Sequence, residues 1–267
     1  MDQQSIIRVC NEANERFITE ALSGFPKYTY LPQWLLSQSL YLKDERTRGK
    51  KNFKVFKRGT IVYVDFGINV GNELSGNHFA IVLNNFDNKK NGVLTVVPIS
   101  SKRKANYVPV GIIVGIQSIK HVIRYSDKQQ EKLRVLLSAS LATGLLDSKT
   151  LPEDLTETLH TGTPITPNEA IQQAIDLDLL CETSADLNKK TKDLLIEIRQ
   201  SRKVFDTYKK YTKESYVMPS NIQSISKHRI KRLNKYDPIG NIKVPAGVLD
   251  NIDASLQERF IKERVED

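Results

Sequence analysis

The sequence predicts an α+β fold in which an antiparallel β core is interrupted by a long helical segment. Three apolar runs rich in β-branched residues, at residues 60–66, 79–83 and 93–99, follow one another closely and predict strands. Residues 171–211 contain neither Gly nor Pro, and their apolar residues approximate a coiled-coil seam. A further apolar run at residues 215–225 predicts another strand, so the helical segment should lie inside the β core.

The chain divides into four regions on these patterns. Residues 1–52 are predicted to form a helical N-terminal extension, with one helix ending near Gly24 and Pro26 and a second starting near Pro32. Residues 53–117 should form the first part of the β core, including a strand at residues 107–116. Residues 118–214 should form the helical insertion, and residues 215–267 should complete the core and end in an amphipathic helix.

The insertion carries its own start and stop signals. Leucines form one stripe over residues 132–146, and Thr166-Pro167-Asn168-Glu169 reads as a capping box that starts a helix. We expect an antiparallel helical hairpin, and an unbroken helix over residues 171–211 would be about 60 Å long. Its role is open between a structural one and partner binding or dimerisation.

Composition and charge limit the function classes. Of the 267 residues 39% are hydrophobic, which is enough for a packed core, and no apolar run approaches the roughly 20 residues that span a bilayer. We expect a cytoplasmic protein without a signal peptide. Cys10 and Cys181 lie far apart without metal-type spacing, so we expect neither a disulfide nor a metal, and no motif indicates a cofactor.

The basic residues favour a polyanionic partner. The chain has 40 Lys and Arg against 31 Asp and Glu, a formal net charge of +9. Many of them cluster at residues 46–58, 102–104 and 227–235. Any single cluster is equally well explained as a solvated loop or helix end, so the choice between solvent and nucleic acid stays open at this point.

The loop between the first two predicted strands is more polar than a simple hairpin requires. It has two glycines, which allow tight turns, and it ends at the mouth of the next strand. Its polar and glycine residues are Asn69, Gly71, Asn72, Glu73, Ser75, Gly76, Asn77 and His78. We therefore expect the chemistry of this protein in that loop.

The arrangement resembles the MazF/PemK family of toxin endoribonucleases. That family begins with an Arg-Gly-Asp-like start and continues with Gly-x-Glu-x-x-Gly-x-Arg-Pro, a Val/Ile strand and a third strand ending in Pro-Ile-Thr-Ser or similar. The matching residues here are Arg58-Gly59-Thr60, Gly71, Glu73, Gly76, Ala80-Ile81-Val82 and Pro98-Ile99-Ser100-Ser101. A second stretch, residues 217–230, is similar to the late strand and basic helix start of the family.

The resemblance implies a fold and an activity. The fold is a small, strongly twisted antiparallel β-barrel of the SH3-like type, shared by MazF-, PemK- and CcdB-like toxins, with a C-terminal helix. The activity is metal-independent cleavage of single-stranded RNA, in which the 2′-hydroxyl attacks and leaves a 2′,3′-cyclic phosphate and a 5′-hydroxyl. The implied partners are this RNA, a cognate antitoxin protein and a second copy in a homodimer.

The resemblance also suggests the catalytic residues. In the family, an arginine before the second strand and a Thr or Ser after the third hold the scissile phosphate. Ser100 matches the latter, with Ser101 beside it, but His78-Phe79 stands where Arg-Pro is usual. We expect His78 to act as general acid or base, Ser100 and Ser101 to hydrogen-bond the phosphate, and Glu73 to orient or act as base. Alternatively, His78 only caps a strand and the enzyme is weakened or inactive.

The expected RNA contacts lie around these residues. Lys102, Arg103 and Lys104 should hold backbone phosphates, and Tyr107 should stack on a base. Some family members have an Arg and a catalytic Asp in the late strand, where this chain has Met218 and Ser220. The remaining candidates for contact with RNA are Arg58, Asn221 and Gln223.

Two other functions stay open on the sequence. Toxins with the same barrel bind a DNA topoisomerase and stall it, which needs no catalytic residues. A non-catalytic RNA-binding regulator that has lost the family arginine is the other alternative.

Overall fold

The computed structural model describes residues 1–47, 49 and 52–261. By its internal contacts the chain forms two compact units. The first contains the described residues of 1–113, 213–232 and 239–267, and the second contains residues 114–212 and 233–238. Three residues of the predicted basic cluster at 46–58, namely residues 48, 50 and 51, lie outside the described residues.

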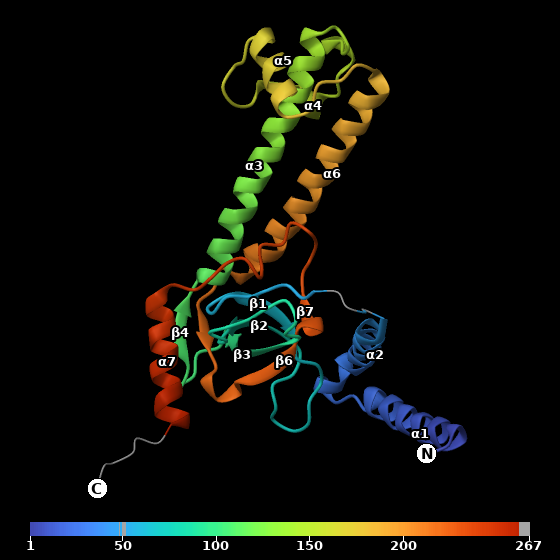
Figure 1. Ribbon diagram of the computed structural model, residues 1–267, viewed down its shortest axis with the longest axis vertical. Coiled ribbons are helices and arrows are strands. Elements are labelled where there is room, and N and C mark those ends of the chain that lie inside the picture. Colours follow the sequence, from blue (N-terminus) through green and yellow to red (C-terminus); the bar gives the residue numbers. More distant parts are fainter. Residues whose placement is uncertain (48, 50–51, 262–267) are drawn as a thin grey trace. The chain divides into compact units, whose positions relative to one another are not determined.

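The first unit is built around a seven-stranded antiparallel sheet (Figure 1). The strand order is β4-β5-β3-β2-β1-β7, and β6 pairs with β3 on the same side as β5. Because β6 pairs with β3 in this sheet, the prediction that the late residues share a sheet with the first strands is confirmed. The strands are β1 (Ile61–Asp65), β2 (Asn77–Val82), β3 (Val93–Ser100), β4 (Val108–Gly111), β5 (Ser215–Val217), β6 (Gln223–Ser226) and β7 (Ile230–Lys231).

The fold combines helices with an antiparallel sheet, as the predicted α+β class requires. The sheet is not a closed barrel, so the predicted barrel is wrong. Among the described residues, the edge strands β4 and β7 pair only with β5 and β1. Strand β7 has two residues, and β4 has four with a register shift between Pro109 and Gly111. The predicted strand at residues 107–116 is therefore too long, because helix α3 already begins at Ile113.

The core of this sheet follows from the alternation of side chains along the strands. One face is filled by buried residues from β1, β2, β3 and β6, together with flanking phenylalanines. These residues are Phe56, Val62, Val64, Phe66, Ala80, Val82, Leu94, Val96 and Ile225. Helix α7 (Ala246–Phe260) ends the described chain, with Ile252 fully buried and Phe260 exposed, so its apolar stripe is buried at its centre.

A buried ion pair connects distant parts of the first unit. The Nζ atom of Lys227 lies 2.8 Å from both carboxylate oxygens of Asp87, and it also donates to the carbonyl of Lys54 at 3.0 Å. The Lys227 and Asp87 side chains are 3% and 0% exposed, so each charge depends on the other for compensation. Lys227 belongs to a basic cluster that the sequence offered for polyanion binding, and here it is a structural residue.

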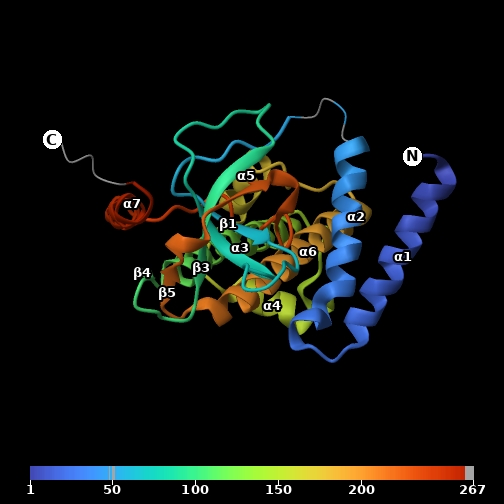
Figure 2. The same ribbon diagram turned by 90° about the horizontal axis from the view of Figure 1, so that it is seen from below.

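Both predicted N-terminal helices form. They are α1 (Gln3–Leu22), which is capped by Asp2, and α2 (Leu31–Thr47), with the short 3-10 helix η1 (Pro26–Tyr30) between them. Helices α1 and α2 lie side by side (Figure 2). No helix within the described ranges has both the length and the apolar character that crossing a membrane requires.

The second unit is helical and more divided than the predicted hairpin. It contains α3 (Ile113–Ala142), α4 (Glu153–His160), α5 (Pro167–Asp176) and α6 (Ser184–Tyr208), with α3 and α6 running alongside each other (Figure 1). The capping box at Thr166 and Glu169 is confirmed. Residues 171–211 do not form one unbroken helix, because Asp178 has φ of 56° and Thr183 caps a new helix. Leucines and alanines of α3, α5 and α6 pack together in a hydrophobic core of this unit.

Candidate functional site

The structure brings His78 and Ser100 together at one end of the sheet. His78 is the second residue of β2 and Ser100 the last residue of β3. Ala80 pairs with Pro98, so the antiparallel register carries His78 toward Ser100 two positions further on. The Nδ1 atom of His78 lies 3.4 Å from the carbonyl oxygen of Ile99, the residue before Ser100.

The His78 ring contacts backbone on both sides. Its Nε2 atom lies 3.2 Å from the carbonyl oxygen of Ser75, and the Phe66 ring meets it edge-on at 6.2 Å between centroids. A neutral imidazole can donate to one of the two carbonyls, whereas an imidazolium can donate to both. His78 is half-buried, so a proton transfer to substrate requires that one of these backbone contacts be exchanged.

Cations follow Ser100 directly. The Ser100 hydroxyl accepts a hydrogen bond from the backbone N–H of Lys102 at 3.0 Å, which turns the chain at the end of β3. Ser101, Lys102, Arg103 and Lys104 are all exposed in the loop that follows. The Lys104 ammonium lies 5.7 Å from the centre of the Tyr107 ring. The loop thus presents three positive charges and one aromatic ring beside Ser100.

The turn between β5 and β6 lies against the same edge of β3. Val217 pairs with Ile99, the N–H of Met218 donates to the carbonyl of Pro98 at 2.9 Å, and Gln223 pairs with Val96. Asn221 and Gln223 are half-buried on this edge. Arg259 of α7 bonds to the Ser220 hydroxyl at 3.0 Å and to the Asn106 carbonyl at 3.3 Å, which links this turn to the cationic loop.

Two predicted residues are not gathered with the others. Glu73 is exposed on the β1–β2 loop, and within the described chain its carboxylate has no hydrogen-bond partner. The Arg58 guanidinium bonds to the Leu83 carbonyl and to Asp253 of α7, at the opposite end of β1 and β2 from His78. The contact of Arg58 with RNA stays a prediction.

The N-terminal extension holds the β1–β2 loop, which the sequence did not indicate. Lys27 donates to the carbonyl of Gly71 at 2.7 Å. The Trp34 ring lies against Gly67 on one side, and the Arg229 guanidinium lies 5.1 Å from the centre of the same ring. The single tryptophan of the chain is therefore a packing residue for this loop.

Asp65 anchors the base of the same loop. Its carboxylate is buried and accepts hydrogen bonds from the Tyr41 hydroxyl at 3.0 Å and the Gly67 N–H at 3.1 Å. Lys231 lies 2.6 Å away as its ion-pair partner. Burial, and then the Asp65 charge, raise the pKa of Tyr41. The contacts of the Asp65 carboxylate therefore fix the start of the β1–β2 loop.

A cavity of about 300 Å³ lies between α2 and this loop, lined among others by Trp34, Asp65, Asn77 and Lys231. Asp65 pairs with Asn77, the neighbour of His78 in β2. Since successive side chains of a strand point to opposite faces, the cavity lies on the other face of the sheet from His78. It does not form part of the His78–Ser100 site.

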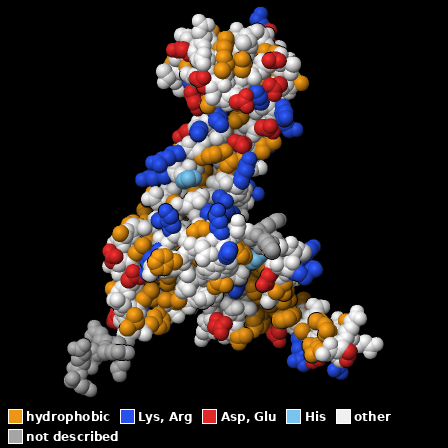
Figure 3. All heavy atoms as spheres, in the orientation of Figure 1, with side chains coloured by type: hydrophobic (Ala, Val, Ile, Leu, Met, Phe, Trp, Pro, Cys, Tyr) orange, Lys and Arg blue, Asp and Glu red, His pale blue; other side chains and the backbone are white. Residues whose placement is uncertain are grey.

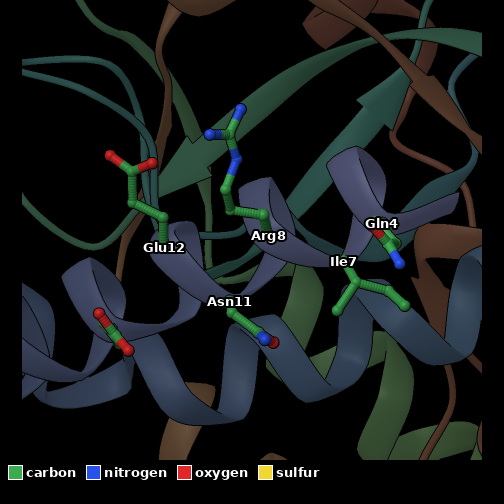
Figure 4. A pocket seen from close by; sticks show the side chains of 6 residues that line it. Gln4, Ile7, Arg8, Asn11 and Glu12 are labelled. Carbon is green, nitrogen blue, oxygen red and sulfur yellow. The ribbon is translucent and has the colours of Figure 1, made fainter. Parts of the chain in front are cut away.

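A second hollow, of about 480 Å³, runs along α1 (Figure 4). All its lining residues come from this one helix, and Arg8 and Glu12 project on one side of it. A surface lined by a single helix has no opposing wall to enclose a ligand. In the part of the chain that the structure describes, no three His, Cys, Asp or Glu side chains gather as metal ligands.

Replacing Gly67 with alanine tests the contact between the extension and the loop. Gly67 and Gly71 have φ of 78° and 58°, so both substitutions strain the backbone. A Cβ at Gly67 would lie 2.5 Å from the Trp34 ring, whereas nothing lies within 4 Å at Gly71. We expect Gly67→Ala to cost about 1–3 kcal/mol more unfolding free energy than Gly71→Ala. Urea unfolding followed by Trp34 fluorescence measures the loss of unfolding free energy in each variant. Equal losses would show that the Trp34 ring moves aside at no cost.

One comparison with known proteins identifies a family. Residues 57–157 match the sequence profile of a family described as PemK-like, MazF-like toxin of type II toxin-antitoxin system. The match covers β1 to β4 and part of the helical unit, and the late strands β5 to β7 lie outside it. No curated protein matches the chain. The resemblance of this chain to the PemK-like, MazF-like toxins of type II toxin-antitoxin systems, predicted from its motifs, is confirmed by that match.

Proposed function

We propose that this chain is the toxin of a type II toxin-antitoxin system and that it cleaves single-stranded RNA without a metal ion. The observation that carries the proposal is the approach of His78 to the end of β3, with Ser100 and three exposed cations directly beyond it. All these residues lie within the stretch that matches the toxin family. A proton-transfer group beside hydroxyl and cationic phosphate ligands is the equipment that this reaction needs.

RNA brings its own nucleophile to such a site. The 2′-oxygen forms a bond to phosphorus and gives its proton to a base, the bond from phosphorus to the 5′-oxygen breaks, and the leaving oxygen takes up a proton. The products are a 2′,3′-cyclic phosphate and a 5′-hydroxyl. The protein has to move the two protons and stabilise the charge on the pentacoordinate phosphorus.

We assign the proton transfer to His78 and the phosphate contacts to Ser100 and Ser101. An imidazole can both take up and release a proton, so it can serve as base or acid. Glu73 has an uncommitted carboxylate on the adjoining loop and serves as the second proton-transfer group or orients the ribose. This division gives every one of the four catalytic candidates a task.

The surrounding residues bind the rest of the RNA. Lys102, Arg103 and Lys104 contact phosphates on either side of the cleaved bond, and Tyr107 stacks on a base. Asn221 and Gln223, on the edge of β3, read base edges through their amides. The partners of this toxin are the RNA, a cognate antitoxin and a second copy of the chain, and it acts in the cytoplasm.

Two alternative functions each have one observation in their favour. Both ring nitrogens of His78 already contact backbone carbonyls, which suits a lapsed enzyme that only binds RNA. The end of α7 exposes Phe260 at 60% and Ile261 at 65%, which suits a toxin that binds a DNA topoisomerase through its C-terminal helix.

Incubation of the purified protein with a mixed single-stranded RNA in excess chelator separates these functions. Our proposal predicts cleavage at preferred sequences under these conditions. RNA that is bound but not cleaved would favour the lapsed enzyme. Neither binding nor cleavage, together with capture of a topoisomerase, would favour the third function.

A further inference from the structure

Charge is unevenly distributed along the helical unit. We call residues 114–130 and 188–212 the stem and residues 131–187 the head. The stem has 11 Lys and Arg against 4 Asp and Glu, a net charge of +7. The head has 3 Lys and Arg against 10 Asp and Glu, a net charge of −7. The charges of stem and head cancel, so the separation of positive from negative charge appears only when the two parts are counted separately.

The cations of α3 stand on its outer face. Lys120, Arg124 and Lys128 follow one another at intervals of four residues, and all three are exposed. Val122 and Gln129 are buried and mark the inner face of the same helix. Like charges four residues apart repel each other and weaken a helix. This arrangement does not stabilise α3, so it requires another explanation.

Helix α6 also carries exposed cations. Lys192, Arg199 and Lys203 are exposed, and the last two are again four residues apart. Of the few acidic residues of the stem, Glu197 is already engaged, because it accepts a hydrogen bond from Tyr125 at 2.9 Å and pairs with Lys235 at 3.1 Å. Figure 3 shows Lys and Arg side chains gathered on the surface of these helices. The stem therefore carries a concentrated positive charge that its own carboxylates do not neutralise.

We propose that the stem is a second RNA-binding surface, which holds the phosphate backbone of a long single-stranded RNA without reading its sequence. Ammonium and guanidinium groups on an exposed helix face recognise phosphates, and such contacts carry no base information. Residues 189–210 span about 30 Å, the rise of roughly nine stacked nucleotides. The choice of RNA rests on the proposed function, whereas the polyanion character of the ligand rests on the charge of the stem alone.

The test uses the full chain with His78→Ala, which is expected to slow cleavage at least about a hundredfold, so that the RNA stays intact during the measurement. Into it we place Lys120→Gln, Arg124→Gln and Lys128→Gln together, and separately Lys192→Gln, Arg199→Gln and Lys203→Gln. The matched control removes the same charge from exposed residues outside the stem, Arg8→Gln, Lys43→Gln and Lys149→Gln. Fluorescence anisotropy with a labelled 30-nucleotide RNA measures affinity over a range of salt concentrations, and circular dichroism checks that the helices are retained.

We expect each stem variant to bind the 30-nucleotide RNA more weakly at low salt. The slope of log affinity against log salt should fall by about 2, roughly 0.7 for each of three lost phosphate contacts. The control should keep both values. In the background with His78 intact, the stem variants should cleave a five-nucleotide RNA as fast as the unmodified chain and the 30-nucleotide RNA more slowly.

Several results would overturn the inference. These are an unchanged slope in both stem variants, an equal loss in the control, or no binding of RNA by the His78→Ala chain at low salt. Binding of the stem to vesicles of anionic lipid, without binding to RNA, would show a membrane surface instead. If the stem variants lose RNA binding while the intact chain cleaves no RNA, the inference stands and the proposed enzymatic function fails.

Discussion

Replacing His78 with alanine is expected to lower the rate of RNA cleavage by about a hundredfold to ten-thousandfold, because the proposed proton-transfer group is removed. The same change at Ser100 should lower the rate through loss of a phosphate contact. Both residues are half-buried at strand ends, outside the apolar core, so the chains should stay folded. Single-turnover cleavage of a labelled RNA measures the rates, and circular dichroism checks the fold.

Two further variants distinguish phosphate binding from proton transfer. Lys102→Ala should weaken binding and lower its salt dependence while turnover persists, since our proposal gives this exposed side chain a phosphate contact only. His78→Arg should retain or raise activity if residue 78 only binds phosphate. If His78 transfers a proton, activity should fall and the acidic limb of the pH profile should move. Full activity of both His78→Ala and Ser100→Ala would place the active site elsewhere.

Replacing Lys227 with methionine is expected to have the largest effect on stability. The change leaves the Asp87 carboxylate, whose side chain is 0% exposed, without its cation. Leaving one charge of a buried pair unpaired costs about 3–5 kcal/mol. Urea unfolding should show this loss, and the double change Lys227→Met with Asp87→Leu should recover much of it. A loss below about 1 kcal/mol in the single variant would mean that water or another donor replaces the lysine.

The same pair predicts a dependence of stability on pH. Burial alone would raise the pKa of Asp87, but the hydrogen bonds from Lys227 and from the Phe56 N–H lower it below its ordinary value of 3.8. A lowered pKa in the folded state means that the stabilisation is present above that ordinary value and is lost as the pH falls through the lowered one. Unfolding measured below about pH 4 should show this loss in the unmodified chain and not in the double variant.

The first three strands, and the proximity of the start of one to the end of another, could be predicted from the sequence because both depend on local patterns. Alternating apolar residues identify β1, β2 and β3, and the short distance between them along the chain leaves only an antiparallel arrangement. That arrangement brings the start of β2 to the end of β3. His78 and Ser100 could therefore be assigned to one candidate site from the sequence.

The break between α5 and α6 shows why other elements were mispredicted. Without Gly or Pro, residues 171–211 offer no strong helix breaker, yet Asp178 adopts φ of 56°. The readable signal was a cap, since the Thr183 side chain accepts a hydrogen bond from the N–H of Asp186. The length of the edge strand at residues 107–116 was mispredicted for a different reason. The length of an edge strand depends on which neighbouring strands it pairs with in the folded sheet.

The contacts of the N-terminal extension had no signal in the sequence. Lys27 and Gly71 are 44 residues apart, and neither belongs to a periodic pattern that the other continues. Contacts between Trp34 and Gly67 are set by tertiary packing in the same way. Such long-range contacts appear only when the fold is known.

The central claim is that this protein cleaves RNA by attack of the neighbouring 2′-hydroxyl. Its most direct test compares two RNA oligonucleotides that are identical except for a 2′-deoxyribose on the 5′ side of the cleaved bond. We predict cleavage of the all-ribose RNA to a 2′,3′-cyclic phosphate and a 5′-hydroxyl, identified by mass spectrometry, and no cleavage at the deoxyribose. Cleavage at the deoxyribose, or products that carry a 5′-phosphate, would contradict the account.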